Sequence, residues 1–417
     1  MSVAHLAPAS ARWARSGLAL LTGDATPALP RRDHARRLEA LLAAARTAGV
    51  EIDMRLFGER AAELGLTRRG RTSANGTARL IETADGWLVV NLARADDLEA
   101  VPAWIGCGLG DEPWAALERA ARRRSAAELA EAGQELAIPA AVVGGRGDIQ
   151  QQARGDILGG RVVRLAPGRG EAVHHPLVID LSSLWAGPLC GQLLGLAGAR
   201  MVKVESAGRP DAARHGPRAF FDRLHAGHES VVLDFATREG RGQLARLIAR
   251  ADLVIESSRP RALEQLGVDL EAAFAANPAL VWVNLTAYGR TGPWRNRVGF
   301  GDDAAAAAGL VVWDGSGRPM FVGDALADPI AGVSAATGAL QALAAGGGLL
   351  VDVALREAAA FVAAADPVAE AELGEVVGGE GTWRWNDTPL APPQARPERG
   401  SAPIMGAHTA AILAEFA

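Results

Sequence analysis

The sequence predicts an α/β protein, with a Rossmann-like, mostly parallel sheet in a large domain and a second, smaller α+β domain. Short runs of Val, Ile and Leu alternate with helical segments in the C-terminal half, as expected for strands that are buried on both faces. In the N-terminal half, an Asp-Gly step separates two apolar runs, which is the pattern of a β-hairpin. A chain of 417 residues is long enough for two or three such units.

The N-terminal elements follow from periodicity and turn residues. Residues 35–48 have helical spacing and end at Gly49, Val50–Met54 alternates like a strand, and Phe57–Leu64 is helical again. The smaller domain begins with the hairpin. Its predicted elements are the strands Thr77–Ile81 and Trp87–Leu92, a single helix Trp114–Glu135, and a short buried strand Ile138–Val143.

The large domain is predicted to alternate strands and helices. Its expected strands are Leu177–Leu181, Met201–Val204, Val231–Leu233, Leu253–Ile255, Leu280–Leu285 and Leu349–Val353. Its expected helices are Leu189–Leu196, Arg238–Arg250, Pro260–Leu266, 331–345 and Arg356–Ala365.

These elements divide the chain into five predicted parts. Residues 49–56 resemble residues 348–355 in sequence, and an alanine-rich helix precedes each, which indicates an internal repeat. The parts are a partial large-domain-like repeat (1–65), a small α+β domain (66–145), a linker (146–175), a Rossmann-like large domain (176–365) and a C-terminal return segment (366–417).

Composition excludes several classes of function. A net charge of -5 disfavours a nucleic-acid binder with a broad basic surface. The two cysteines, Cys107 and Cys190, fit no disulfide framework or zinc site, which indicates a reducing cytoplasm. No uncharged apolar run reaches the ~18 residues of a membrane span. Lys203 is the only lysine in an Arg-, Ala- and Gly-rich chain, which is typical of a GC-rich bacterial genome, and we expect its charge to reach solvent near Glu205.

A series of short motifs begins in the first strand of the large domain. They are Val178-Ile-Asp-Leu-Ser182, Ala186-Gly-Pro188, Gly198-Ala-Arg-Met-Val-Lys-Val-Glu205, Tyr288-Gly-Arg-Thr-Gly-Pro293 and Gly299-Phe300. In this order, residues 177–365 resemble the large domain of the family III CoA-transferases, which include formyl-CoA and carnitine CoA-transferases and the acyl-CoA racemases. Residues 71–145 are similar to the family's small domain, and Ala402–Thr409 resembles its usual ending.

The resemblance implies an enzyme that moves CoA from an acyl-CoA to a small carboxylic acid through an aspartyl anhydride and an enzyme–CoA thioester. No cofactor would be permanently bound, because CoA is the substrate. The family's nucleophilic aspartate is followed by two glycines, a pattern that Asp328 fits with Gly332 and Gly338 and that Asp324 does not. The alternative for Asp328 is a helix N-cap, a position that Asp also favours.

Family resemblance also implies where CoA would bind. The ligand would lie along the carboxyl ends of the parallel strands. Candidate contacts are Leu184, Trp185, Ala186, Ser206, Ser257, Arg259 and Arg297, with Arg295 a further candidate for the phosphates. A metal site is not expected, because His225 and His228 have no third ligand nearby in the sequence.

Two departures from the family pattern leave alternatives open. Where relatives carry a basic segment, this chain has Gly227-His228-Glu229-Ser230, so a catalytically lapsed acyl-CoA-binding or structural subunit is the first alternative. Racemases use a histidine where this chain has Phe300, which cannot transfer a proton, so a racemase is less expected. Relatives form interlocked dimers through long linkers, and the resemblance implies a homodimer in which residues 146–175 play that part.

Overall fold

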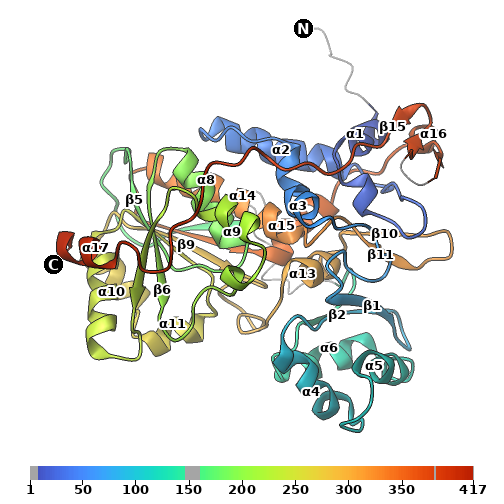
Figure 1. Cartoon of the computed structure of the whole chain (residues 1–417), viewed down its shortest axis with the longest axis horizontal. Coiled ribbons are helices and arrows are strands. Elements are labelled where there is room, and N and C mark those ends of the chain that lie inside the picture. The colour runs from blue at the N-terminus through green and yellow to red at the C-terminus, as the bar shows by residue number, and fades with distance from the viewer. Residues whose placement is uncertain (1–7, 146–159, 380–381, 417) are drawn as a thin grey trace.

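The structure is a computed structural model and describes residues 8–145, 160–379 and 382–416. Its centre is a seven-stranded sheet in which all neighbouring strands are parallel except the antiparallel edge pair β4–β12 (Figure 1). In spatial order the strands are β4 (Gly160–Arg164), β12 (Leu349–Ala354), β9 (Val281–Thr286), β8 (Leu253–Glu256), β5 (Leu177–Asp180), β6 (Arg200–Ser206) and β7 (Glu229–Leu233).

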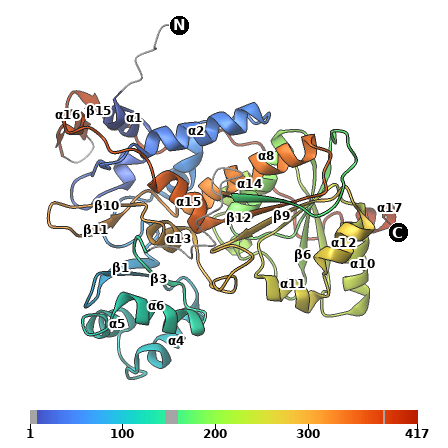
Figure 2. The ribbon, with the colours of Figure 1, turned by 180° about the vertical axis from the view of Figure 1, so that it is seen from behind.

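Helices cover both faces of this sheet, which explains why its strands are apolar throughout. Along β5, Val178 joins the hydrophobic core on one face and Ile179 joins the core on the other. The first face is covered by α8 (Ala186–Leu196) and α14 (Ala327–Ala344), and the second by α10 (Arg238–Arg250), α11 (Pro260–Leu266) and α12 (Leu270–Ala276) (Figure 2). The predicted doubly covered parallel sheet is confirmed.

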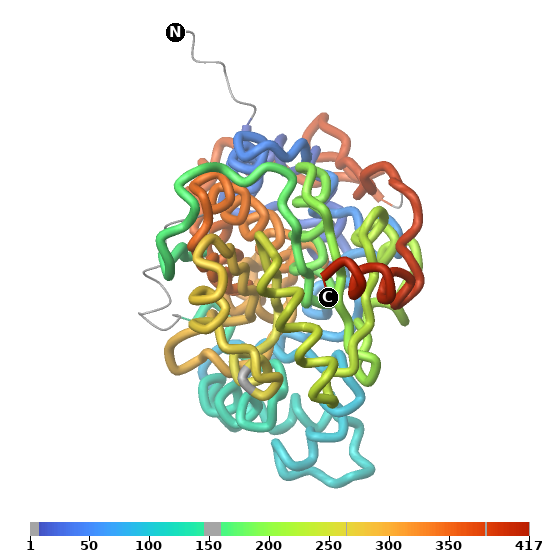
Figure 3. The backbone as a smooth tube through the Cα atoms, turned by 90° about the vertical axis from the view of Figure 1, so that its left-hand side faces the viewer, coloured from blue at the N-terminus to red at the C-terminus, as the bar shows by residue number. Residues whose placement is uncertain are grey.

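The small unit is an antiparallel sheet of β1 (Ala78–Glu82), β2 (Trp87–Asn91) and β3 (Ala140–Val142). One face packs on α4 (Ala95–Ile105), α5 (Pro113–Ala121) and α6 (Ala126–Glu135). The other face packs on α13 (Gly301–Ala307) and on the hairpin β10 (Val311–Trp313)–β11 (Pro319–Phe321). The small unit therefore contacts the large domain through α13, and Figure 3 shows it at the opposite end of the molecule from α1 (Ala9–Arg15).

The N-terminal segment lies beside the first part of the C-terminal return segment. The N-terminal segment continues from α1 into α2 (His34–Thr47), a 3-10 turn (Met54–Phe57) and α3 (Glu59–Leu64), and α2 packs on α14 and α15 (Leu355–Ala363). Near α1 lie α16 (Glu370–Leu373) and a small sheet of β13 (Val376–Val377), β14 (Arg384–Trp385) and β15 (Thr388–Pro389). The chain then crosses the molecule to α17 (Thr409–Glu415), which packs on the edge strand β7 (Figure 1).

The C-terminal ending satisfies the free edge of β7. The backbone N–H of Ser230 donates to His408 Nδ1 at 3.0 Å, and that of Val232 donates to Thr409 Oγ1 at 3.0 Å. These side chains thus take the place of a further strand at an edge that would otherwise be open to pairing.

Three expected elements differ from the structure. No strand forms at Val50–Met54, because Asp53 accepts the Arg55 N–H at 3.0 Å and starts a 3-10 turn instead. The single helix predicted over Trp114–Glu135 is two helices, because Ser125 caps α6 by accepting the Glu128 N–H at 3.1 Å. Part of the predicted linker forms β4, which pairs with β12, while residues 146–159 of that linker lie outside the described residues.

The predicted repeat stays a prediction. Its strand in the second copy is β12, whereas the equivalent residues of the first copy are not a strand.

Candidate active site

Asp328 lies in the first turn of α14, where the helix begins four residues earlier than predicted. The N-cap position belongs to Leu326, so the expected alternative that Asp328 caps this helix is wrong. The Asp328 side chain is half-buried, and burial is the main cause that raises its pKa to about 7. A carboxylate with little water around it is a better nucleophile than one in bulk solvent.

The N-terminal end of α13 packs against Asp328. The backbone N–H of Gly301 hydrogen-bonds to the Asp328 carboxylate, and this bond acts to lower its pKa. A methyl group at position 301 would come within 2.2 Å of Asp328 Oδ2 and within 2.3 Å of the Ala325 carbonyl oxygen. Only glycine therefore allows the backbone to approach the carboxylate this closely.

Two more buried carboxylates surround one arginine beside Asp328. Arg60 of α3 donates to both oxygens of Asp324, from Nε at 2.7 Å and from Nη2 at 2.5 Å. Asp302 of α13 accepts the Ala325 N–H at 2.8 Å, and burial followed by the charge of Asp324 raises its pKa to about 7. Three carboxylates thus share one guanidinium, and the site carries surplus negative charge when all are ionised.

The small unit supports this arrangement with two asparagines. Asn75 donates to Asp302 Oδ2 at 3.2 Å, and Asn91 of β2 donates to Asp303 Oδ1 at 3.1 Å. Asp302 and Asp303 are consecutive residues in the first turn of α13. Burial raises the pKa of Asp303 to about 7 as well. Docking of the small unit therefore fixes the turn that presents Gly301 to Asp328.

The loop before α8 borders the same site. Ala186 approaches α14 so closely that a methyl group on Gly332 would lie 2.9 Å from its carbonyl oxygen. Trp185 is buried, and the Arg60 guanidinium lies over its ring at 4.5 Å. Leu184 is exposed and has a left-handed backbone with φ of 71°, an unusual conformation for a branched residue. The structure thus brings Ala186 against α14 and Trp185 against Arg60, and Leu184 precedes them in the same loop.

A network around Lys203 holds this loop. Lys203 is buried, against the expectation that its charge reaches solvent, and its Nζ lies 3.0 Å from Asp211 Oδ2 and donates to the Ser182 carbonyl at 2.8 Å. The Leu184 N–H donates to Asp211 Oδ1 at 3.0 Å. Glu205 pairs with Arg214, not with Lys203. The lone lysine therefore fixes the backbone just before Leu184.

The remaining predicted CoA contacts are more scattered. Ser257 follows β8 and accepts the Ser183 N–H at 3.1 Å, so it lies against the same loop. Ser206 ends β6, and Arg259 follows β8 with an exposed side chain. Arg297 is occupied elsewhere, since it pairs with Glu131 of α6 and lies over Trp294 at 4.0 Å. Arg295 is exposed near it. Roles of these residues in binding CoA stay predictions.

The two histidines singled out in the sequence are buried. His225 ends α9 (Arg218–His225) and contacts His228 edge to face, with ring centroids 5.5 Å apart. Burial lowers the pKa of His228 to about 4. Within residues 8–145, 160–379 and 382–416, no group of three His, Cys, Asp or Glu side chains could hold a metal ion.

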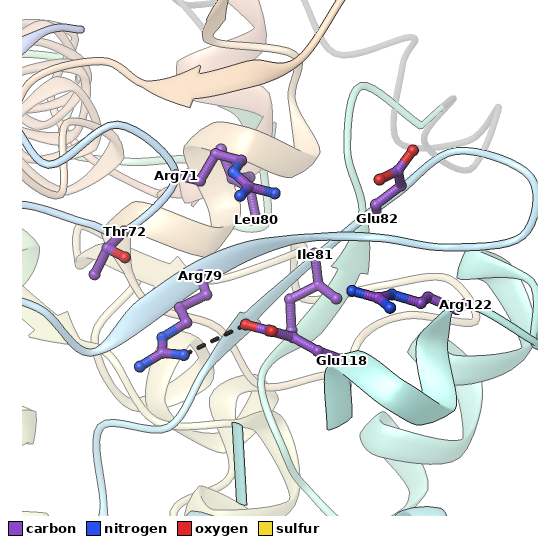
Figure 4. A pocket seen from close by; sticks show the side chains of 8 residues that line it. All are labelled: Arg71, Thr72, Arg79, Leu80, Ile81, Glu82, Glu118 and Arg122. Atoms are coloured by element: carbon purple, nitrogen blue, oxygen red, sulfur yellow. Dashed lines mark hydrogen bonds and ion pairs between the residues drawn. The ribbon is translucent and has the colours of Figure 1, made fainter. Parts of the chain in front are cut away.

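A separate pocket lies in the small unit, between β1 and α5 (Figure 4). Arg79 and Glu118 face each other across it with an N–O distance of 3.5 Å. Its charged lining consists of Arg71, Arg79, Arg122, Glu82 and Glu118. Because two carboxylates accompany three guanidinium groups, the pocket has little net charge with which to select an anion, and we assign it no ligand.

Three residues of the site were not predicted from the sequence: Arg60, Asp302 and Gly301. The paired aspartates directly after Gly301 were a usable signal, because buried acids at a helix start are uncommon. Arg60 gave no signal, since it is one of many arginines in Arg–Ala–Glu helices.

The fold and this site together define a doubly wound α/β protein with a desolvated carboxylate beside the carboxyl-end loops of its sheet. The chain belongs to CoA-transferase family III, whose sequence model matches residues 176–390, more than half of its length. No helix in the described part of the chain has the length and apolar character needed to cross a bilayer.

Individual relatives match the same half. Succinyl-CoA–D-citramalate CoA-transferase of Chloroflexus aurantiacus is 35% identical over 193 residues, which are 43% of this chain and 48% of that protein. Succinate–glutarate CoA-transferase of Agrobacterium fabrum is 33% identical over 217 residues, 48% of this chain and 54% of that protein. A solved CAIB/BAIF family protein from Brucella suis has 30% identity and a TM-score of 0.43 over 47% of this chain and 56% of that one. The chain thus spans about half the length of the curated relatives it matches.

Proposed function

We propose that this protein transfers CoA from an acyl-CoA thioester to a carboxylic acid, with Asp328 as the nucleophile. The observation that carries the proposal is the position of Asp328. Its carboxylate is half-buried, receives the Gly301 N–H, and lies at the start of α14, one helical turn before the contact with α8. Membership of the family supports the same reaction.

The reaction needs one enzyme carboxylate, and it proceeds by two acyl-transfer steps with the donor and two with the acceptor. The Asp328 carboxylate attacks the thioester carbonyl, the C–S bond breaks, and CoA leaves as a thiolate while a mixed anhydride forms. The thiolate then attacks the Asp328 carbonyl carbon, the donor acid leaves as a carboxylate, and CoA remains on Asp328 as a thioester. An acceptor carboxylate reverses these two steps and departs as the new acyl-CoA. Close placement of the reactants replaces bulk concentration at each step.

Neighbouring groups have defined tasks in this scheme. The Gly301 N–H orients the carboxylate. Leu184 and Ser257 lie on the carboxyl-end loops where an extended ligand would run. No permanently bound cofactor is needed, because the nucleophile and the leaving thiolate supply all the electrons involved.

The test is an exchange assay with a panel of acyl-CoA donors and isotope-labelled acids, read by mass spectrometry. Wild-type protein is expected to form labelled acyl-CoA. Asp328→Asn should lower the rate by at least about a thousandfold, as removal of a nucleophile does. Asp314→Asn, on the exposed β10–β11 turn, is the matched control and should retain wild-type activity. Equal rates in wild type and Asp328→Asn would overturn the proposal.

A lapsed acyl-CoA-binding protein is the second candidate, and one observation favours it. Glu229 pairs with Arg200 at 2.7 Å and His228 is buried, so this segment offers no cation where relatives carry basic residues. In that case acyl-CoA would bind without exchange. A racemase would instead exchange the α-proton in D₂O, which we expect to be absent because Phe300 cannot transfer a proton.

The assembly and location form part of the proposal. We expect a homodimer in the cytoplasm. Two Chloroflexus aurantiacus relatives are named as alpha and beta subunits of a succinyl-CoA–L-malate CoA-transferase, at 35% and 36% identity. Light scattering that gives the mass of a single chain at micromolar concentration would dismiss the dimer.

A further inference from the structure

The N-terminal segment reaches the candidate nucleophile through a short helix. All six residues of α3 lie outside the stretch that matches the family, yet this helix supplies the arginine whose charge acts on Asp328. Arg60 is anchored by two parallel hydrogen bonds to Asp324, and its guanidinium lies over the Trp185 ring. A guanidinium held by a fork and by a ring has little freedom to turn away.

The rest of α3 is anchored just as firmly. Glu59, which is fully buried, accepts two hydrogen bonds from Arg396 of the return segment, at 2.6 and 2.7 Å. Glu63 pairs with Arg223 of α9. Arg396 also donates to Gln192 of α8 at 3.0 Å. The return segment and α9 therefore hold α3 in place through Glu59 and Glu63, and Arg60 lies between these two residues in the helix.

The charges that face Asp328 come from three elements. Asp302 and the Gly301 N–H belong to α13, Asp324 belongs to the turn before α14, and Arg60 belongs to α3. Arg60 is the one cation among the groups that shift the pKa of Asp328. Ala325, which follows Asp324 in the turn before α14, has a left-handed backbone with φ of 44°. This conformation fixes the direction of the turn.

We propose that Arg60 is a positioning residue for the nucleophile: held in place by Asp324 and the Trp185 ring, it balances the negative charge of the acids around Asp328 without touching substrate. This inference rests on the proposed function only for its kinetic readout. Without Arg60, Asp324 and Asp302 repel the charge on Asp328, and the nucleophile takes up a proton. A protonated carboxyl group cannot attack the thioester carbonyl.

The test compares pH profiles of kcat/KM in wild type, Arg60→Gln, Arg60→Lys and Asp324→Asn. Arg60→Gln should move the midpoint of the acidic limb, where activity rises as Asp328 ionises, upward by about one pH unit and lower kcat/KM at pH 7 about fivefold. Asp324→Asn should move the midpoint downward, because a repelling charge is lost and Arg60 turns to Asp328. Arg60→Lys keeps the charge and should restore a midpoint close to that of wild type. Arg55→Gln, an exposed arginine of the same segment, is the control expected to change nothing.

A second readout does not depend on activity. The pH dependence of carbodiimide labelling, mapped to the Asp328 peptide by mass spectrometry, measures its ionisation directly, and it should show the same shifts. Unchanged midpoints in Arg60→Gln, even with lower activity, would overturn the inference and leave Arg60 a purely structural role. If that variant fails to fold, Asp324→Asn decides, since an unchanged or raised midpoint contradicts the proposal. Absence of CoA transfer in wild type would refute the proposed function alone, because labelling would still measure the ionisation of Asp328.

Discussion

Two buried clusters of acidic residues flank the loop before α8, and they differ in how their charge is balanced. Around Lys203, each acid lies within 4 Å of a cation: Asp211 at 3.0 Å and Asp180 at 3.9 Å from the ammonium group, and Glu205 paired with Arg214. Asp211 also accepts backbone N–H groups, while burial raises the pKa of Asp180. Around Asp328, three carboxylates share Arg60, whose hydrogen bonds both go to Asp324. The balanced cluster holds a loop in place. In the unbalanced cluster, the negative charges of Asp302 and Asp324 repel the half-buried Asp328 carboxylate.

This difference explains how buried acids can have a structural role in one cluster and a reactive role in the other. A buried acid that is paired and fully hydrogen-bonded is inert, because its charge is already neutralised. A buried acid that lacks its own partner has a raised pKa and gains from any reaction that removes its charge. Formation of an anhydride or a thioester does this to Asp328. We therefore expect the two clusters to respond in opposite directions when a charge is deleted.

The largest effect is expected at Lys203. Lys203→Met removes the only ammonium group of the balanced cluster and leaves Asp211 and Asp180 as buried charges without a counter-ion. The free energy of unfolding, measured with urea, should fall by about 3–5 kcal/mol. Arg318→Gln, which breaks an exposed pair with Asp314, should change it by less than about 1 kcal/mol. Similar small losses in both variants would show that the first cluster is not a scaffold.

The next effect is expected at the contact between α13 and Asp328. Gly301→Ala would place a methyl group 2.2 Å from Asp328 Oδ2, so either the helix start or the carboxylate has to move. The free energy of unfolding should be about 1–3 kcal/mol lower than in wild type, and CoA transfer should be lost. Gly315→Ala is a matched control, because nothing lies within 4 Å of its added carbon. Wild-type transfer in Gly301→Ala would mean that this contact does not position the nucleophile.

A smaller effect of opposite sign is expected when Asp328 itself is neutralised. Its pKa is about 7 in the folded protein and near 4 when unfolded, so the folded state retains a proton that the unfolded state loses. Stability due to this proton is complete below pH 4 and is lost as the pH rises through 7. Asp328→Asn should therefore raise the free energy of unfolding by about 1–2 kcal/mol at pH 8 and by much less at pH 4. Destabilisation at pH 8 would place Asp328 with the scaffold.

Most of the fold could be predicted from the sequence, because it depends on local patterns. All six strands expected in the large domain are present, since Val, Ile and Leu runs such as Leu253–Glu256 report burial on both faces. The hairpin of β1 and β2 followed from its Asp-Gly turn. Failures occurred where a single side chain decided the outcome, as when Asp53 and Ser125 capped helical turns.

The site was predictable only in part, for a physical reason. Asp328 and the Leu184–Ala186 loop lie on motifs of consecutive residues, so sequence spacing could point to them. Arg60 and Asp302 are 268 and 26 positions away from Asp328 along the chain, and their contacts depend on how α3 and α13 pack. Lys203 was misplaced because the sequence does not show that Asp211 folds back over it.

In the proposed reaction, Asp328 forms a covalent bond first with the acyl group and then with CoA. The most direct measurement is mass spectrometry of peptides from protein quenched during reaction with an acyl-CoA. A CoA thioester or an acyl group is expected on the peptide that contains Asp328, and no such adduct in Asp328→Asn. Transfer that proceeds while Asp328 stays unmodified, or with an adduct on another residue, would contradict it.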